Sequence, residues 1–387
     1  MQTGKAAVWK GIYDIEIRNL PVPDVKDDGC LIKVEAAGVC GTDGHLIKQD
    51  PPYPAIMCHE IVGRIVSLGK YANKSLNIYG GPLKIGDRIV LYPWITCGKC
   101  EGCMIHRPGT CTTCNDSFVY GVPYSKLGLE GTETINSNIE EVPYFKGGFA
   151  EYVYVFPETY VWKIPDDMPS EVAVLLDPMA VAVRAVELAQ TCPGILEEAV
   201  STSSKVVVMG SGPIGVLAAL TVRLMGVEQV IMVGGRKKRL EIAKEIANVD
   251  ETIDIHEIPV NERIARVKAM TGGGAHLVLQ CANTTGAFVE GLEMIRRLGT
   301  LVEVGNMVNM GHEVSIDPAR LICSKHATII GMSANHPGAF DKAFHLLKRH
   351  KTIPFTKIFT HTCSIEGVLD TLKAMGDADY MKGLMIP

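Results

Sequence analysis

The sequence lacks any apolar run long enough to cross a bilayer. Its longest apolar stretches, Lys205–Gly210 and Val216–Leu220, are short and are bounded by glycine or charge, whereas a membrane-spanning helix needs about 20 apolar residues. The first residues, MQTGKAAVWKG, contain neither an apolar signal core nor a cleavage site. We therefore expect a protein that has no membrane partner and resides in the cytoplasm.

The sequence also lacks an excess of positive charge. It has 38 Lys and Arg against 43 Asp and Glu, which gives a net charge of −5 at pH 7. A basic surface field is the usual mark of nucleic-acid binding, so we expect no nucleic-acid partner. The 387 residues are 47% hydrophobic and 21% charged, as in ordinary globular proteins, and this length predicts two or three domains.

The sequence contains 12 cysteines but no secretion signal. They are therefore read as reduced thiols or metal ligands rather than as a disulfide framework. The run CGKCEGCMIHRPGTC places Cys97, Cys100, Cys103 and Cys111 at a spacing that suits tetrahedral zinc. Four thiolates leave no open position for substrate, so this zinc would be structural. The alternatives are four unrelated core cysteines or a disulfide pair, and Cys114 is expected to be a free thiol.

The first third of the chain has short β-branched runs that are bounded by glycine or proline and shows few helical periods, which predicts a compact β lobe. After about Pro169, apolar runs alternate with segments of helical spacing, which predicts an α/β half with a doubly wound parallel sheet. The expected strands are Cys30–Ala37, Ile61–Ser67, Asp87–Leu91, Phe149–Val155, Lys205–Met209, Gln229–Val233, Thr252–Ile255, His276–Ala282, Thr300–Gly305 and Thr328–Gly331. The expected helices are Pro213–Met225, Lys237–Ala247, Val260–Met270 and Thr285–Leu298.

A glycine-rich turn follows the first strand of this α/β half and opens a helix. Its residues are Gly210, Ser211, Gly212, Pro213, Ile214 and Gly215. In this setting a G-x-G-x-x-G turn binds the pyrophosphate of a dinucleotide at the helix N-terminus. A merely structural glycine turn is the alternative.

The end of the second strand bears on which dinucleotide binds. An acidic residue there would bind the adenosine ribose, but the chain reads Val233-Gly234-Gly235 and continues with four cations, Arg236 to Arg239. Guanidinium groups suit phosphate. We therefore expect NADP(H) rather than NAD(H), with Gly235 at the turn, Arg236 as the main phosphate clamp and Arg239 as a second. An ordinary solvated helix start is the alternative.

Several further motifs contain residues of metal-ligand type. Cys40 lies in GVCGTDGH, His59 and Glu60 lie in CHEIVG, and Asp177 lies in LLDPM. A catalytic zinc typically has about three protein ligands and one open position. Sequence spacing alone would not bring these residues together.

Taken in order, these motifs resemble those of the zinc-dependent medium-chain alcohol and polyol dehydrogenases. The resemblance rests on G-V-C-G-T-D-x-H, H-E-x-x-G-x-x-x-x-x-G ending at Gly69, Gly86-Asp87-Arg88, the four-cysteine run, GGFAEY from Gly147 and the glycine turn. It implies a GroES-like, β-rich catalytic domain at 1–169 and 334–387 with a structural zinc lobe at 95–115. It also implies a Rossmann dinucleotide-binding domain at 170–333 and a homodimer or homotetramer.

The resemblance also implies the site residues. Cys40 and His59 match the catalytic zinc ligands, and Glu60 matches a glutamate that ligates zinc or exchanges with substrate or water. Asp177 matches a position where the sorbitol and threonine dehydrogenase branches carry glutamate or aspartate. Thr42 is the candidate to take the alcohol proton, with a turn hydroxyl as its alternative role. His45 would relay that proton, with a packing imidazole as the alternative.

The resemblance favours a dehydrogenase that transfers a hydride between NADP(H) and a polyol, sugar or secondary alcohol, or its carbonyl, with one catalytic and one structural zinc. Two other readings remain open at this point. One is a zinc-independent quinone or enone reductase of the same fold. The other is a zinc-stabilised nucleotide-sensing protein without turnover.

Overall fold

The structure is a computed structural model that describes residues 2–105, 113–114, 116–128, 134–190, 200–307 and 311–387. The chain forms two compact units. The first unit comprises Met1–Asp177, Asn335–Lys351 and Phe359–Pro387, and the second comprises Pro178–Ala334 and Thr352–Ile358. No helix in the described part of the chain has the length and apolarity that a membrane span requires.

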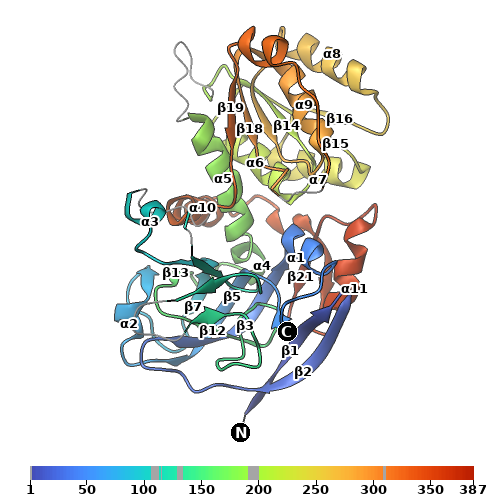
Figure 1. Ribbon diagram of the computed structural model, residues 1–387. Coiled ribbons are helices and arrows are strands. Elements are labelled where there is room, and N and C mark those ends of the chain that lie inside the picture. The colour runs from blue at the N-terminus through green and yellow to red at the C-terminus, as the bar shows by residue number, and fades with distance from the viewer. Residues whose placement is uncertain (1, 106–112, 115, 129–133, 191–199, 308–310) are drawn as a thin grey trace. The chain divides into compact units, whose positions relative to one another are not determined.

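The first unit is built around an eight-stranded sheet with the order β20-β21-β3-β5-β7-β13-β6, and β12 pairs with β3 outside this path. Most neighbours are antiparallel, so the predicted β lobe is confirmed (Figure 1). Its strands are β1 Thr3–Gly11, β2 Asp14–Pro21, β3 Cys30–Val39, β4 Ala55–Ile56, β5 Glu60–Leu68, β6 Asn77–Tyr79, β7 Arg88–Leu91, β8 Trp94–Thr96, β9 Ser117–Val119, β10 Lys126–Leu127, β11 Ile135–Asn136, β12 Tyr152–Val155, β13 Tyr160–Lys163, β20 Phe359–Cys363 and β21 Lys382–Met385.

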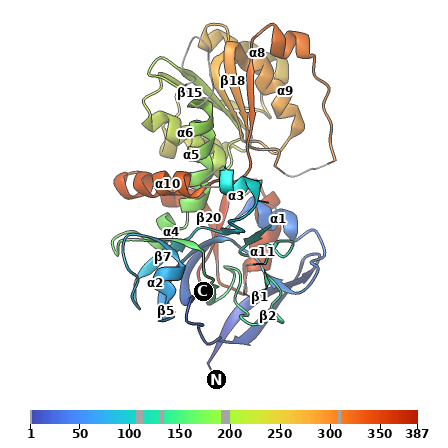
Figure 2. The same ribbon diagram turned by 60° about the vertical axis from the view of Figure 1, so that its left-hand side comes forward.

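Short helices connect these strands. α11 packs against α1, and Figure 2 shows the two helices together. The helices of the first unit are α1 Gly41–Leu46, α2 Ala72–Ser75, α3 Glu101–Ile105, α4 Ser170–Ala173, α10 Pro337–Arg349, α11 Val368–Lys373 and η4 Ala374–Gly376. Helix α5, Leu176–Gln190, begins in the first unit and continues into the second.

The second unit has a six-stranded parallel sheet in the order β16-β15-β14-β17-β18-β19 (Figure 1). Numbered from its first strand, this is the 3-2-1-4-5-6 order of doubly wound dinucleotide-binding folds. Helix α6 packs beside α7, and α8 packs beside α9. Because parallel crossovers are right-handed, these two pairs cover opposite faces of the sheet. The predicted doubly wound sheet is therefore confirmed.

The elements of this unit follow the predicted alternation closely. They are β14 Lys205–Met209, α6 Pro213–Leu224, β15 Gln229–Gly234, α7 Lys237–Ala247, β16 Glu251–Asp254, α8 Val260–Thr271, β17 Ala275–Gln280, α9 Thr285–Met294, β18 Ile295–Glu303, η2 Ala319–Cys323, β19 Thr328–Gly331 and η3 Phe355–Ile358. The helix expected over Thr285–Leu298 ends earlier, at Met294. Ile295 pairs with Ala275 of β17, so its backbone is already extended.

The boundaries between the units differ from the expected ones at three places, of which one is Ala334, which belongs to the second unit. Residues 170–177 belong to the first unit, because Ser170 binds Arg88 and α4 packs on β3 and β5. Thr352–Ile358 belongs to the second unit, where η3 packs on α7 and Lys357 forms an ion pair with Glu245.

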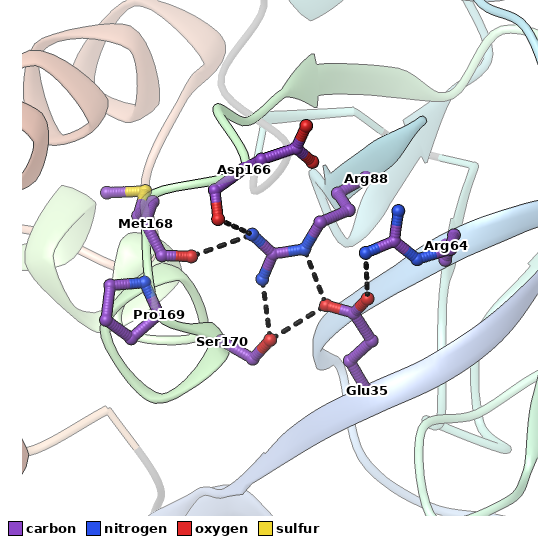
Figure 3. A pocket seen from close by; sticks show the side chains of 7 residues that line it. All are labelled: Glu35, Arg64, Arg88, Asp166, Met168, Pro169 and Ser170. Atoms are coloured by element: carbon purple, nitrogen blue, oxygen red, sulfur yellow. Dashed lines mark hydrogen bonds and ion pairs between the residues drawn. The ribbon is translucent and has the colours of Figure 1, made fainter. Parts of the chain in front are cut away.

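A buried guanidinium organises one edge of the first unit (Figure 3). Arg88 donates to Glu35 Oε2 and Ser170 Oγ at 2.7 Å each, to Met168 O at 2.8 Å, and to Pro165 O at 3.2 Å. The Arg88 side chain is 6% exposed, so its guanidinium is largely shielded from water. Burial would raise the pKa of Glu35, but the hydrogen bonds from Arg88 and Ser170 outweigh it and lower that pKa. The surrounding pocket is lined by Glu35, Arg64, Arg88, Asp166, Met168, Pro169 and Ser170.

We predict that Arg88→Met lowers the free energy of unfolding of the first unit by about 3 kcal/mol, because it removes the buried one of the two cations that bind Glu35 and leaves the Met168 carbonyl without its donor. Arg64→Met is the matched control. Arg64 binds the same carboxylate at 3.1 Å but is 45% exposed, so its loss should cost less than about 1 kcal/mol. Urea unfolding followed by tryptophan fluorescence measures this unit alone, because Trp9, Trp94 and Trp162 all belong to it. Equal effects of the two changes would contradict the prediction.

Candidate functional site

Strand pairing places Cys40 beside His59. Strands β3 and β5 are antiparallel, with Gly38 directly opposite Glu60. Cys40 follows β3 by one residue, and His59 precedes β5 by one residue. Residues that face each other across such a pair are about 5 Å apart. Continued by two residues, this register puts Cys40 opposite Cys58, next to His59, so the two candidate ligands, 19 positions apart in sequence, come to the same end of the sheet.

Cys40, His59 and Glu60 form a group that could hold a metal ion. One ligand atom from each lies within 4.8 Å of the others. His59 and Glu60 are buried, and Cys40 is half-buried. The buried Nδ1 of His59 has no hydrogen-bond partner among the described residues. A thiolate, an imidazole and a carboxylate are the donors that zinc accepts.

Asp43, which the sequence analysis quoted only as part of a motif, supports both ligand-bearing segments. Its buried carboxylate accepts from the backbone N–H of Cys40 at 2.9 Å (Oδ2) and of Cys58 at 3.2 Å (Oδ1). Burial raises the pKa of Asp43 to about 6. Its position three residues into a helix that starts after Cys40 is the sequence signal that could have identified it.

The electrostatics of the group call for a cation. Burial would lower the pKa of His59, but Cys40, Asp43 and Asp177 raise it to about 10. Several acidic groups thus converge on one buried imidazole, and a bound cation would stabilise their negative charge. The donor set, its burial and the unpartnered His59 nitrogen all fit a zinc ion.

Asp177 lies near this group but does not join it within the described residues. It is 5% exposed, and its Oδ1 accepts from Asn335 Nδ2 at 2.9 Å. Asn335 is fully buried, and its own carbonyl accepts from Tyr92. Burial raises the pKa of Asp177 to about 6, an increase that the charge of His59 opposes.

Glu60 also binds a cation of the protein itself, which the sequence analysis did not anticipate. Lys382 of β21 lies 2.8 Å from Glu60 Oε1 and 2.7 Å from Oε2. Both side chains are almost completely buried.

Cys58 is buried with φ at +81°, a left-handed conformation that favours glycine. Its thiol faces the carbonyl oxygens of Gly38 and Glu60 at 3.4 and 3.5 Å. The left-handed backbone explains why glycine suits this position. Cys58 does not belong to the metal-ligand group among the described residues.

The two candidate proton carriers lie on or beside the same short helix. Thr42 Oγ1 is 3.7 Å from Cys40 Sγ, and its side chain is half-buried. His45 is half-buried too, and burial lowers its pKa, as does the charge of Lys48. His45 is therefore mostly neutral at pH 7, the form that can both accept and donate a proton.

A second cluster contains four cysteines. The thiols of Cys97, Cys100, Cys103 and Cys114 lie within 4.8 Å of one another. The backbone N–H of Cys97 donates to Cys114 Sγ at 3.3 Å. Cys111, the fourth ligand expected from the sequence, lies outside the described residues. Cys114, expected to be a free thiol, lies with the other three thiols among the described residues.

The glycine turn has the shape that a pyrophosphate needs. Gly210 has φ of +97°, and a Cβ on Gly215 would lie 1.8 Å from Gly210 O, so both must be glycine. A Cβ on Gly212 would meet nothing within 4 Å, which leaves space in front of α6. Pro213 opens that helix, and Ile214 follows it. These are the three glycine roles of a dinucleotide-binding turn.

The turn after β15 lies next to the glycine turn. Ser211 Oγ donates to Gly235 O at 2.7 Å. A Cβ on Gly235 would lie 2.6 Å from His256 Nε2, so the chain passes close to the turn that follows β16. Arg236 has φ of +65° and precedes α7, while Arg239 lies in its first turn, and both are half-buried.

Two family models match the chain. Residues 26–166 match the alcohol dehydrogenase GroES-like domain, and residues 213–349 match the zinc-binding dehydrogenase domain. Among curated proteins, sorbitol dehydrogenase of Bacillus subtilis is 29% identical over 311 residues, covering 79% of this chain and 75% of its own. D-xylulose reductase A of Aspergillus oryzae is 27% identical over 389 residues, covering 97% and 94%.

Solved structures agree with these matches. An alcohol dehydrogenase from Thermotoga maritima superposes with a TM-score of 0.87 at 26% identity, and each chain is fully covered. A Sinorhizobium meliloti protein solved with bound NADP gives 0.81 at 25% identity, also over both full chains. The chain therefore belongs to the zinc-dependent medium-chain alcohol dehydrogenase family and is an alcohol or polyol oxidoreductase.

Proposed function

We propose that the protein transfers a hydride between NADP(H) and a polyol, sugar or secondary alcohol, or its carbonyl, with one catalytic and one structural zinc. The observation that carries this proposal is the buried group of Cys40, His59 and Glu60. A protein that bound only the structural zinc would not need this second group of metal-ligand residues. The names of the sorbitol and xylulose relatives support a polyol or its ketose as substrate.

Cys40 and His59 would hold the catalytic zinc, with Glu60 or Asp177 as the third ligand. When bound, zinc acts as a Lewis acid toward the substrate oxygen. Asp43 fixes the Cys40 and Cys58 backbones, so the ligands are positioned before a metal arrives. The dinucleotide takes or gives the hydride, and the chain supplies orientation and electrostatics.

Thr42 would accept the alcohol proton at its Oγ1, and His45 would pass it outward. The half-buried position of both side chains and the neutral form of His45 at pH 7 support these roles. The cytoplasmic location and the homodimer or homotetramer stay predictions.

We predict that Cys40→Ser lowers kcat/KM for NADP-linked polyol oxidation at least about 100-fold, because a weaker ligand loosens the catalytic metal. Zinc content should fall from about two ions per chain to about one. Cys323→Ser, at an exposed cysteine, is the control and should change neither quantity. A wild-type protein that binds nucleotide and one zinc, but turns over no alcohol or carbonyl, would sink the proposed function in favour of a sensor.

The structural zinc would be held by Cys97, Cys100, Cys103 and Cys114, and their mutual distances support this set. We predict that Cys114→Ser removes about one zinc per chain and lowers the unfolding temperature, whereas Cys111→Ser retains the metal. Metal analysis and thermal unfolding of the two variants decide whether Cys111 or Cys114 is the fourth ligand. The reverse pattern would restore Cys111 as the ligand.

The absence of a carboxylate in Gly234-Gly235 and the placement of Arg236 support NADP(H). We predict that Arg236→Asp reduces the preference for NADPH over NADH, measured as a ratio of dissociation constants by cofactor fluorescence, by about 100-fold. Lys238→Asp makes the same charge change at an exposed neighbouring position and should leave the ratio within about threefold. If the wild type already prefers NADH, the assignment of Arg236 is wrong.

A further inference from the structure

The segments that follow β14, β17 and β18 meet at Ala282 in the second unit. A Cβ on Gly210, the first residue of the glycine turn, would lie 2.7 Å from Ala282 N. A Cβ on Gly305, two residues after β18, would lie 2.0 Å from Ala282 O. The loop after β17 therefore passes between two positions that must lack a side chain. Close contacts thus lead from the glycine turn across β17 to the end of β18.

These contacts lie on the side of the glycine turn away from Arg236. β15, which leads to Gly235 and Arg236, pairs with one edge of β14, and β17 pairs with the other edge. In doubly wound folds each half of the sheet holds one nucleotide of a dinucleotide at the carboxyl ends of its strands. With the adenosine at β15, as proposed for Arg236, the nicotinamide half of the site belongs to β17 and β18.

Glu303, the last residue of β18, places a carboxylate in this nicotinamide half. The Glu303 Oε1 atom accepts from the backbone N–H of Asn306 at 2.9 Å and from Asn306 Nδ2 at 3.2 Å. It also accepts from Gln280 Nε2 at 3.1 Å. Gln280 is completely buried, and its side chain accepts from Ala282 N at 2.6 Å and donates to Ala282 O at 2.8 Å. The carboxylate is thus fixed to the loops that follow β17 and β18.

No cation balances this carboxylate among the described residues. Every donor to Glu303 in this part of the chain is a neutral amide. Burial raises the pKa of Glu303, although its hydrogen bonds from Asn306 and Gln280 oppose the increase. Burial also raises the pKa of Cys281 to about 12, and the charge of Glu303 adds to that increase. A half-buried carboxylate that only neutral groups hold would be stabilised by a cation.

We propose that the Glu303 carboxylate strengthens binding of the oxidised dinucleotide relative to the reduced one by stabilising the positively charged nicotinamide ring. This inference rests on the proposed function, because it requires a nicotinamide cofactor at the glycine turn. The oxidised ring is cationic and the reduced ring is neutral, whereas the two forms share every other group. A fixed negative charge in the nicotinamide half therefore distinguishes between them.

Isothermal titration calorimetry measures the dissociation constants of the oxidised and reduced cofactors separately. We expect Glu303→Gln to weaken binding of NADP⁺ relative to NADPH by about tenfold, because the charge is lost while the shape is kept. NAD⁺ and NADH are titrated in parallel, so the result does not depend on the preferred dinucleotide. Glu257→Gln is the matched control. It makes the same charge change at an exposed position after β16, in the adenosine half, and should leave the ratio within about twofold.

Two further variants complete the test. Glu303→Asp keeps the charge and should hold the ratio within about threefold of wild type. Asn306→Lys leaves Glu303 in place and puts an ammonium on the residue that binds its carboxylate. The ratio should then fall as it does in Glu303→Gln, because the added cation neutralises the carboxylate. This arm stands even where Glu303→Gln does not fold.

The inference is overturned if Glu303→Gln weakens both cofactor forms equally, because Glu303 would then support the loops or bind a ribose hydroxyl without sensing the ring charge. It is equally overturned if the ratio stays at the wild-type value in folded Glu303→Gln or in Asn306→Lys. In each case a wild type that binds the cofactor and oxidises an alcohol leaves the proposed function intact. A wild type that binds neither cofactor form would overturn both.

Discussion

The antiparallel pairing of β3 with β5 is the constraint on which the candidate metal site depends. Because Gly38 faces Glu60, the residues just beyond the paired segment, Cys40 and His59, come to the same end of the sheet. A slip of one residue would turn every side chain of a strand to the opposite face of the sheet. Asp43 then ties the two loops together through backbone N–H groups. The sheet therefore brings the two loops together, and the hydrogen bonds of Asp43 hold them there.

Much of the fold could be predicted from the sequence, because its signals are local. Strands buried on both faces appear as apolar runs, and the glycines of the turn from Gly210 to Gly215 respond to steric demands within a few residues. The end of α9 was missed because pairing with Ala275 across the sheet, rather than local propensity, makes Ile295 extended. Tertiary pairing overrides propensity at such boundaries.

The site was predictable only in part, because contacts between residues far apart in sequence determine it. Cys40 and His59 could be found through motifs, but their proximity depends on strand pairing, and the ion pair of Glu60 with Lys382 spans 322 positions. No spacing rule detects such a contact. Cys114 was passed over because Cys111 offered an equally plausible spacing. Metal analysis of the Cys111→Ser and Cys114→Ser variants would decide between the two thiols.

The insertion of the second unit between two parts of the first has a consequence for the order of folding. β21 enters its place between β20 and β3 only after the whole parallel-sheet unit has been synthesised. Contacts of such long range close slowly, because loop entropy must be overcome first. During synthesis on the ribosome, the β-rich unit therefore lacks β21 beside β3, and Glu60 lacks its ion pair with Lys382, while the inserted unit can already fold. The end of the β-rich sheet that carries Cys40, His59 and Glu60 is therefore completed last.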